Sequence, residues 1–153
     1  MIKDSGNRQE FETGAVRDMQ EGKGRCDLLP LDVVSDLFIH FENKQDAVLF
    51  AISVFVSSKN VLCLMSALHC FIKLKGWDLP TMLLEVSKHF EEGAKKYGEY
   101  NWQKGLPVES YINSGVRHYL KWLRGDDDEP HDRAFCWNII CCIWTHRHCN
   151  KEG

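Results

Sequence analysis

Residues 79–97 read LPTMLLEVSKHFEEGAKKY and predict the fold of the chain, because their spacing is that of one long amphipathic helix. Asp78 stands where an N-cap residue is expected, and Pro80 falls in the first turn, where proline is tolerated. Gly98 follows the last periodic residue, as at many helix ends. The apolar residues recur every three or four positions and share one face: Met82, Val86, Phe90, Ala94 and Tyr97.

The same periodicity continues on both sides of this stretch. It predicts helices near 30–41, 46–57, 61–74, 79–97, 107–124 and 130–147. For the β-branched run at 48–56 we predict a buried helix, with a strand as the alternative. Residues 1–29 are polar, and no stretch carries a convincing hairpin signal. We therefore predict an all-α bundle of five or six helices, with a single helical domain over 30–150 and an irregular N-terminal arm over 1–29.

The composition is that of one globular domain. The chain has 153 residues, 44% of them hydrophobic, and a net charge of −3 at pH 7. This composition excludes disorder as the main state and a large surface for duplex nucleic acid, which usually carries excess basic residues. No apolar run reaches the roughly 18 residues of a membrane span, and the polar start of the chain is unlike a secretory signal. We expect a cytoplasmic chain whose seven cysteines are reduced and serve as small hydrophobic residues.

A second line of residues borders the apolar face of the predicted 79–97 helix. It consists of Glu85, His89, Glu92 and Lys96, at intervals of four, three and four residues. Such a line is either the wall of a groove between helices or a solvated face held by ion pairs between neighbouring turns.

A basic line follows on the predicted 107–124 helix. Arg117, Lys121 and Arg124 lie at intervals of four and three, with His118 at the edge of the apolar face. Arginine and lysine in such a line suit phosphate oxygens, and the alternative is a plain solvated face. Because a short loop joins this helix to the preceding one, carboxylates for a metal and cations for phosphate are expected to face each other.

Four consecutive acidic residues, 126–129, precede the last predicted helix. Acidic residues stabilise the positive end of a helix dipole, which alone explains one or two of them. Glu129 and Asp132 also form an E-x-x-D pair one turn apart, and Mg²⁺ takes hard oxygen ligands that it shares with phosphates. The run predicts a magnesium site, with helix-end charges that bind no metal as the alternative.

Three other positions are candidates for ligand contacts. Asn138 stands in the apolar last helix, where a buried amide must be hydrogen-bonded. Its expected role is to orient a carboxylate, to read a base or to bond a backbone carbonyl. Lys23 and Arg25 lie in the loop EGKGR at 21–25, which lacks the Walker pattern. This loop is either a small backbone anion site or a flexible charged arm.

Several blocks of sequence occur in a specific combination. At the N-terminus they are RQEFETGAVRD at 8–18, QEGKGR at 20–25 and DLLP at 27–30. Further on they are HFEEGAKKYG at 89–98, Asn101-Trp102, Lys104-Gly105, Tyr111, RHYLKW at 117–122, Arg124-Gly125 and HDRAFCWN at 131–138. Together they resemble a phage and prophage family, the dATP/dGTP diphosphohydrolase N-terminal domain. Residues 35–77 fall outside these blocks and look like an inserted helical segment.

The resemblance implies an activity. The family is similar to the all-α, MazG-like nucleotide pyrophosphohydrolases, which hold Mg²⁺ or Mn²⁺ on carboxylates of facing helices and cut between the α and β phosphates. A chain of this kind would cleave dATP- or dGTP-like nucleotides to a monophosphate and pyrophosphate. The E-x-x-D pair is present here, whereas a clean E-x-x-E pair is absent. Because groove residues in this superfamily often come from two subunits, a dimer or tetramer is expected.

Each candidate residue takes an expected role under this interpretation. The expected metal ligands are Glu85, Glu92, Asp126, Glu129 and Asp132. The expected catalytic residues beside the phosphates are Lys96, Arg117 and His118. The expected nucleotide-binding residues are Lys23, Arg25, Asn101, Trp102, Lys121, Arg124 and Asn138. Among them, Trp102 is expected to stack on the base, and Asn101 or Asn138 to read its edge. The alternatives are a non-catalytic protein that sequesters a host signalling nucleotide in phage counter-defence, and a structural helical adaptor.

Overall fold

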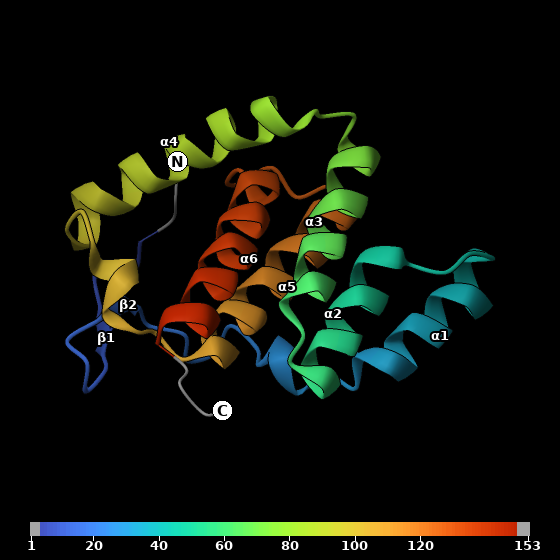
Figure 1. Cartoon of the computed structure of the whole chain (residues 1–153), viewed down its shortest axis with the longest axis horizontal. Helices are drawn as coiled ribbons and strands as arrows, with labels where there is room; N and C mark the ends of the chain where they lie inside the picture. The colour runs from blue at the N-terminus through green and yellow to red at the C-terminus, as the bar shows by residue number, and fades with distance from the viewer. Residues whose placement is uncertain (1–3, 150–153) are drawn as a thin grey trace. The chain divides into compact units, whose positions relative to one another are not determined.

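The computed structural model describes residues 4–149, which form six α-helices and a small two-stranded hairpin (Figure 1). The prediction of an all-α bundle is confirmed. The helices are α1 (Leu31–Glu42), α2 (Ala47–Ser58), α3 (Val61–Lys75), α4 (Leu79–Tyr97), α5 (Val108–Arg124) and α6 (His131–His148). Each begins and ends within one residue of its predicted bounds. None of the helices in the described part of the chain is both long enough and apolar enough to cross a membrane.

The chain divides into two compact units, which are described separately. The three-helix unit is Leu28–Met82 and contains α1, α2, α3 and the first turn of α4. The cavity unit consists of the residues on either side of it, of which 4–27 and 83–149 are described; it contains the rest of α4, the hairpin, α5 and α6.

The run at 48–56 in the three-helix unit is helical, as predicted. The carboxylate of Asp46 accepts a hydrogen bond from Leu49 N at 2.8 Å and caps α2, and Asn60 caps α3 in the same way through Leu62 N at 3.0 Å. The core of the unit is apolar: Val48, Leu49, Ile52, Phe55, Leu64, Ala67, Leu68 and Phe71. Local caps and burial of this face favour the helix over a strand.

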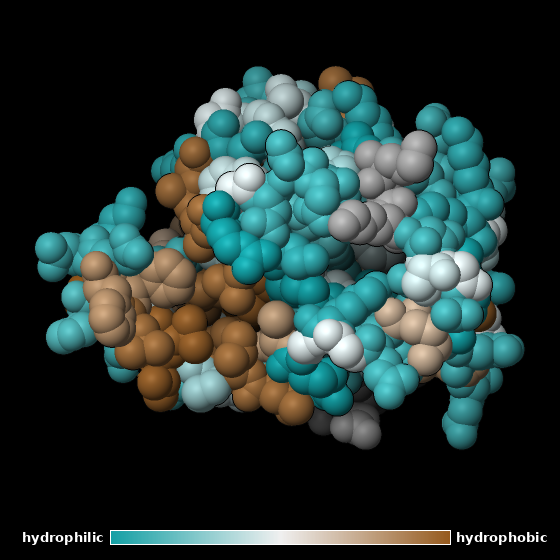
Figure 2. Space-filling view, turned by 180° about the vertical axis from the view of Figure 1, so that it is seen from behind, coloured by the Kyte–Doolittle hydropathy of each residue, from teal (hydrophilic) through white to brown (hydrophobic). Residues whose placement is uncertain are grey.

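Several large apolar side chains of the three-helix unit are exposed. They include Val33, Leu37, Ile39, Phe41, Phe50, Leu62 and Leu74. Figure 2 shows apolar side chains gathered in one area of the surface, toward the end of the view where α1 and α2 lie. Exposed apolar areas of this kind often mark interaction surfaces.

In the cavity unit, α5 packs closely on α6. A Cβ atom at Gly115 would lie 3.3 Å from Ile139 Cδ1 and 3.5 Å from Asn138 Cβ, so glycine permits this approach. As predicted, α6 is buried along most of its length, and three of its cysteines pack in the core: Cys136, Cys141 and Cys142. All seven cysteines are free thiols.

The N-terminal arm contains a β-hairpin that the sequence did not predict. Strand β1 (Arg8–Glu10) pairs antiparallel with β2 (Val16–Asp18), with Arg8 opposite Asp18. Because β1 is polar and fully exposed, it has no alternation of apolar and polar residues to reveal it. The hairpin is held by a distant side chain: Val16 N donates to Asn101 Oδ1 at 2.8 Å, and Asn101 Nδ2 donates to Val16 O at 2.7 Å. The amide of Asn101 thereby extends the strand pairing.

Candidate functional site

A cavity of about 190 Å³ lies within the cavity unit. Its walls come from β2 and the loop after it, the second half of α4, the segment 98–106, α5, Glu129 and α6. A short 3-10 helix, Asn101–Lys104, carries Trp102 to this cavity. The segments that carried most of the family resemblance therefore surround one space.

One side of the cavity is aromatic. The rings of Phe90 and Trp102 are 5.4 Å apart, and those of Phe90 and Trp137 are 5.9 Å apart, all in edge-to-face contact. Tyr97 and Leu106 also line the cavity. Flat aromatic surfaces of this kind are suited to stacking on a planar ring.

Four cations line the same cavity, with different surroundings. Arg17 Nη1 donates to Ser110 O at 3.1 Å. Lys23 Nζ is paired with Asp18 Oδ2 at 2.8 Å. Arg117 is buried and donates to Gln20 Oε1 at 3.1 Å and to Gly24 O at 2.8 Å. Lys121 has no ion-pair partner among residues 4–149. Lys121 is therefore the cation most available to an anionic ligand.

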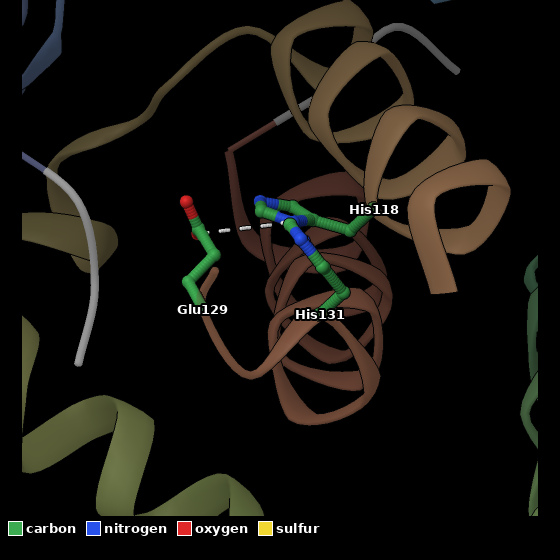
Figure 3. Close-up of side chains that lie close together, drawn as sticks. All are labelled: His118, Glu129 and His131. Carbon is green, nitrogen blue, oxygen red and sulfur yellow. Dashed lines mark hydrogen bonds and ion pairs between the residues drawn. The ribbon is translucent and has the colours of Figure 1, made fainter. Parts of the chain in front are cut away.

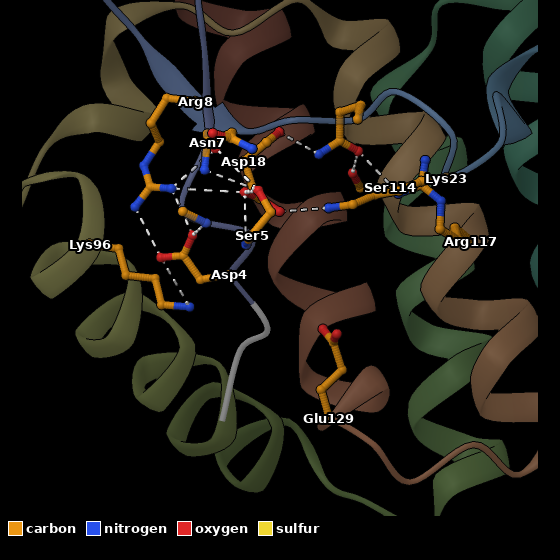
Figure 4. Close-up of polar contacts among 12 residues, drawn as sticks. Asp4, Ser5, Asn7, Arg8, Asp18, Lys23, Lys96, Ser114, Arg117 and Glu129 are labelled. Atoms are coloured by element: carbon orange, nitrogen blue, oxygen red, sulfur yellow. Dashed lines mark hydrogen bonds and ion pairs between the residues drawn. The ribbon is translucent and has the colours of Figure 1, made fainter.

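The carboxylate of Asp18 anchors the arm beside the cavity (Figure 4). Burial by itself would raise the pKa of Asp18, but hydrogen bonds from Lys23 and Ser5 outweigh it, so the pKa lies below its usual value. Ser5 Oγ donates to Asp18 Oδ1 at 2.5 Å, and Arg8 lies 3.8 Å away. Asp18 therefore stays ionised and joins the start of the chain to the 18–23 loop.

Polar side chains of α5 hold the remainder of the arm. Asn113 Oδ1 accepts from Cys26 N at 2.7 Å and from Arg117 Nη2 at 2.9 Å. Ser114 Oγ donates to Gln20 Oε1 at 3.5 Å. Arg117 was expected to neutralise phosphates, and Asn101 to read a base. Both line the cavity and use several of their polar atoms to bind the backbone or side chains of the arm, so they shape the cavity wall.

A cluster of two histidines and a glutamate lies at the cavity wall: His118, His131 and Glu129, here called the acid–histidine cluster. His118 Nδ1 is 2.9 Å from His131 Nδ1 and 3.9 Å from Glu129 Oε1. His131 Nε2 is 2.6 Å from Asp128 Oδ1. Figure 3 shows the two rings close together, with Glu129 reaching toward them from the segment before α6. His118 and Glu129 line the cavity, whereas the side chain of His131 is 0% exposed.

Asp128 fixes the orientation of the His131 ring. Its carboxylate accepts a hydrogen bond from His131 Nε2 at 2.6 Å, so Nδ1 of His131 faces Nδ1 of His118. Burial and the neighbouring His131 lower the pKa of His118 well below 6.5, so its ring is neutral at pH 7.

His89 is a second neutral histidine on the cavity wall. Burial, assisted by the positive charge of Arg133, lowers its pKa from 6.5 to about 4. Its ring lies 5.0 Å from that of Trp137. At pH 7 His89 therefore contributes a polar but uncharged edge.

Four cavity-lining side chains have a buried polar atom without a hydrogen-bond partner in the described chain. They are His89 Nδ1, Arg117 Nε, Trp137 Nε1 and Asn138 Oδ1. Asn138 Nδ2 donates to Ala134 O at 2.8 Å, which fixes the amide and leaves Oδ1 as an acceptor. Buried polar atoms without partners are uncommon, and their grouping here indicates a polar occupant of the cavity.

The structure brings only some of the predicted site residues together. Eight of them line the cavity: Lys23, Asn101, Trp102, Arg117, His118, Lys121, Glu129 and Asn138. Seven others do not: Arg25, Glu85, Glu92, Lys96, Arg124, Asp126 and Asp132.

Each of these seven residues has a polar partner in the described chain. Arg25 is paired with Asp27 at 2.7 Å, Arg124 with Asp126 at 2.5 Å, and Glu85 with Lys88 at 2.8 Å. Glu92 is paired with Arg133, and Lys96 lies 3.9 Å from Asp4. Asp132 Oδ1 accepts from Arg133 N at 2.7 Å at the start of α6.

The five expected metal ligands do not form one cluster. Within residues 4–149, two groups have ligand atoms close enough to share a metal ion: His118, Glu129 and His131, and Asp126, Asp128 and His131. Glu85, Glu92 and Asp132 belong to neither group. Glu85 and Glu92 pair with Lys88 and Arg133, whereas a mixed acidic and histidine cluster could hold a metal ion.

His131 was not among the predicted site residues. Its signal was a histidine at the first position of a helix, directly after an acidic run. The sequence could not pair it with His118, because the two residues belong to different helices that meet only in the folded unit.

Comparison with known proteins agrees with these observations. No curated protein and no solved structure shows a significant match to the chain. A family model does match residues 66–152, from within α3 through α6. The matched region includes the acid–histidine cluster and most of the cavity wall, but not the arm. The chain therefore belongs to the family described as dATP/dGTP diphosphohydrolase, N-terminal.

Proposed function

We propose that this chain binds a purine deoxynucleoside triphosphate in the cavity and hydrolyses it to a monophosphate and pyrophosphate. One observation carries the proposal: aromatic rings, an unpaired lysine and the His118–Glu129–His131 cluster adjoin the same cavity. Membership of the dATP/dGTP diphosphohydrolase N-terminal family supports the substrate class.

The base would lie against the aromatic side of the cavity. Trp102 offers a flat surface, and Trp137 Nε1 offers a donor without a partner in residues 4–149. Asn138 Oδ1 offers an acceptor. The edges of nucleic-acid bases present both donors and acceptors, so these two atoms match a base, and the family description supports a purine. Filling their hydrogen-bonding capacity would remove the cost of leaving them unpaired.

The phosphates would lie toward Lys121 and the acid–histidine cluster. Lys121 supplies a positive charge that no described residue neutralises, and Lys23 supplies a second one shared with Asp18. Cations placed where negative charge develops stabilise the transition state of phosphoryl transfer. In this reaction water attacks phosphorus, the bond between the α-phosphorus and the bridging oxygen breaks, and pyrophosphate leaves.

The donor atoms of the cluster test whether Mg²⁺ suits this site. Mg²⁺ prefers an octahedron of oxygen ligands, usually from carboxylates, water and phosphate. The cluster on the cavity wall has two imidazole nitrogens and one carboxylate. The residues present do not match a protein-held Mg²⁺ ion, so no step is assigned to one.

The proposal is tested by chromatography of products. The full chain is incubated with dATP, dGTP, the other nucleoside triphosphates and cyclic nucleotides, with Mn²⁺, Zn²⁺ or Mg²⁺ and with EDTA. We expect equal amounts of deoxynucleoside monophosphate and pyrophosphate from dATP or dGTP. Release of orthophosphate in place of pyrophosphate, or neither turnover nor retention of any nucleotide, would overturn the proposal.

A second candidate is a protein that binds a signalling nucleotide without cleaving it. The observation that favours it is that Glu85 pairs with Lys88 and Glu92 with Arg133. Of the five expected metal ligands, Glu129 alone lines the cavity described here. In the same experiment, this function predicts tight retention of an intact nucleotide that EDTA does not reverse.

We also propose that the chain assembles as a dimer or tetramer. The exposed apolar side chains of α1 and α2 support this assembly, because such areas are often covered in oligomers. Light scattering coupled to size-exclusion chromatography measures the mass in solution. A mass of one chain at micromolar concentration would contradict the proposal.

A further inference from the structure

Four side chains around the start of α6 form a layered arrangement of metal-ligand type. His118 and Glu129 line the cavity, His131 lies behind them, and Asp128 lies behind His131. We infer that His118, His131 and Glu129 hold a transition-metal dication such as Mn²⁺, Co²⁺ or Zn²⁺, in preference to Mg²⁺. The inference deepens the proposed function and rests on it for the role of the metal, but not for its binding.

The spacing of the donor atoms supports the inference. The two Nδ1 atoms lie 2.9 Å apart. Two nitrogens bound to one ion at about 2.1 Å in a tetrahedral site are separated by about 3.4 Å, so the two rings would have to move apart by about 0.5 Å. The ion would lie to one side of the line between the nitrogens and would replace their hydrogen bond. Glu129 Oε1, 3.9 Å from His118 Nδ1, is a third donor on a side chain with rotatable bonds.

The surroundings of His131 match those of a metal-bound histidine. Its side chain is fully buried, and its Nε2 donates to Asp128 at 2.6 Å, which directs Nδ1 toward His118. Metal-bound histidines usually donate their other ring N–H to a carboxylate or carbonyl, which fixes the ring and raises its basicity. Asp128 fulfils this role here.

The chemistry of the donors selects the class of metal. Imidazole binds later first-row dications more strongly than it binds Mg²⁺, and two imidazoles with one carboxylate form a common transition-metal set. A site with three protein ligands leaves positions open, as catalytic metal sites do. Two of the three ligands line the cavity, so an open position would face a bound phosphate.

The second group of possible ligands is less suitable. Asp126 and Asp128 with His131 also bring three donor atoms together. However, both carboxylate oxygens of Asp126 accept hydrogen bonds from Arg124, at 2.8 and 2.5 Å. A metal at this group would have to displace a bidentate ion pair, and the cavity does not extend to it.

Metal binding is measured without nucleotide. The full chain is stripped with a chelator and dialysed against Zn²⁺, Mn²⁺ or Mg²⁺, and bound metal is counted by mass spectrometry. Co²⁺ binding is followed by visible absorption. We expect one Zn²⁺ or Co²⁺ per chain, bound at least about 100-fold more tightly than Mg²⁺. Retention of less than one ion per chain, or equal affinity for Mg²⁺, would overturn the inference.

Two ligand variants with matched controls locate the ion. Glu129→Gln is expected to lower the affinity by at least about 10-fold, while Glu91→Gln, on an exposed glutamate, leaves it unchanged. His131→Gln is expected to abolish binding, and His69→Gln, in the three-helix unit, is its control. Circular dichroism of each variant verifies folding, and Glu129→Gln keeps the test valid if His131→Gln unfolds. Wild-type affinity in folded Glu129→Gln would overturn the inference.

The outer carboxylate has a particularly close control. Asp128→Asn is expected to weaken Zn²⁺ or Co²⁺ binding by about 10- to 100-fold with the stoichiometry retained. Asp127→Asn changes the neighbouring exposed residue and is expected to have no effect. Equal effects of the two substitutions would show that only the local charge matters, which would contradict the role of Asp128.

Failure of this inference is distinguishable from failure of the proposed function. Stoichiometric metal binding without pyrophosphate release from any nucleotide would retain the metal site and overturn the hydrolase. Pyrophosphate release by a chain that binds no Zn²⁺ or Co²⁺ in the dialysis would retain the hydrolase and overturn the metal site.

Discussion

The three-helix unit and the cavity unit use their side chains in different ways. The core of the three-helix unit is built from aliphatic and aromatic residues, and Ser35 is its one buried polar residue among those described. The cavity unit buries nine polar or charged residues of its described part: Asp18, His89, Asn101, Asn113, Ser114, Arg117, His131, Asn138 and Thr145. Burying polar groups is costly unless they are paired, so a unit that buries many of them is organised around specific contacts. The three-helix unit is therefore organised by apolar packing, and the cavity unit by specific polar contacts.

The largest expected effect tests whether the three-helix unit contributes only packing. Phe71→Ala removes a fully buried ring from its core and should destabilise the chain by about 3–5 kcal/mol in urea unfolding. At a temperature where the variant is folded, its kcat/KM for the nucleotide should stay within about twofold of wild type. Loss of turnover in the folded variant would show that this unit takes part in the site.

The next largest effect tests the role of Lys121 in the cavity unit. Lys121→Ala should lower kcat/KM by about 100-fold, equivalent to about 2.7 kcal/mol, because a preorganised charge beside the phosphates is lost. Its unfolding free energy should change little. Lys44→Ala, on an exposed lysine of the three-helix unit, is the control. Equal rates in the two variants would remove Lys121 from the site.

A third effect concerns pH and belongs to the cavity unit. The pKa of His89 is about 4 in the folded chain and near 6.5 when unfolded, so the unfolded state binds the proton more tightly. Stability should therefore fall as pH decreases from 7 to 5, by about 2 kcal/mol from this group. The fall should be smaller in His89→Phe and unchanged in His69→Phe, measured by urea unfolding at each pH. His118, whose pKa is also lowered, acts in the same direction.

The smallest expected effect concerns the exposed pair of Arg124 and Asp126. Asp126→Asn should change the free energy of unfolding little, because exposed ion pairs contribute little to stability. Metal affinity should change by less than about twofold in equilibrium dialysis. A loss of one bound ion per chain in this variant would move the metal to Asp126, Asp128 and His131.

About half of the predicted site residues line the cavity, because they lie close together in a few short segments that the sequence identifies. The basic line on α5 placed His118 and Lys121 on the cavity, and the block Asn101-Trp102 placed Trp102 there. The predicted carboxylate line on α4 was in place as a helix face. Its glutamates bind Lys88 and Arg133, and the second of these partners lies 41 residues away. Helical spacing predicts which residues share a face, but not which side chain from another helix will pair with them.

The sequence by itself determined the six helices, their ends and the buried character of α6. These depend on interactions within a few residues: apolar spacing, the caps at Asp46 and Asn60, and glycines after helix ends. Only the tertiary structure decided the hairpin, held by Asn101 from 85 residues away, and the meeting of His118 with His131. The reason is that side-chain pairing between distant segments depends on how helices pack, and this information is spread over the whole folded unit.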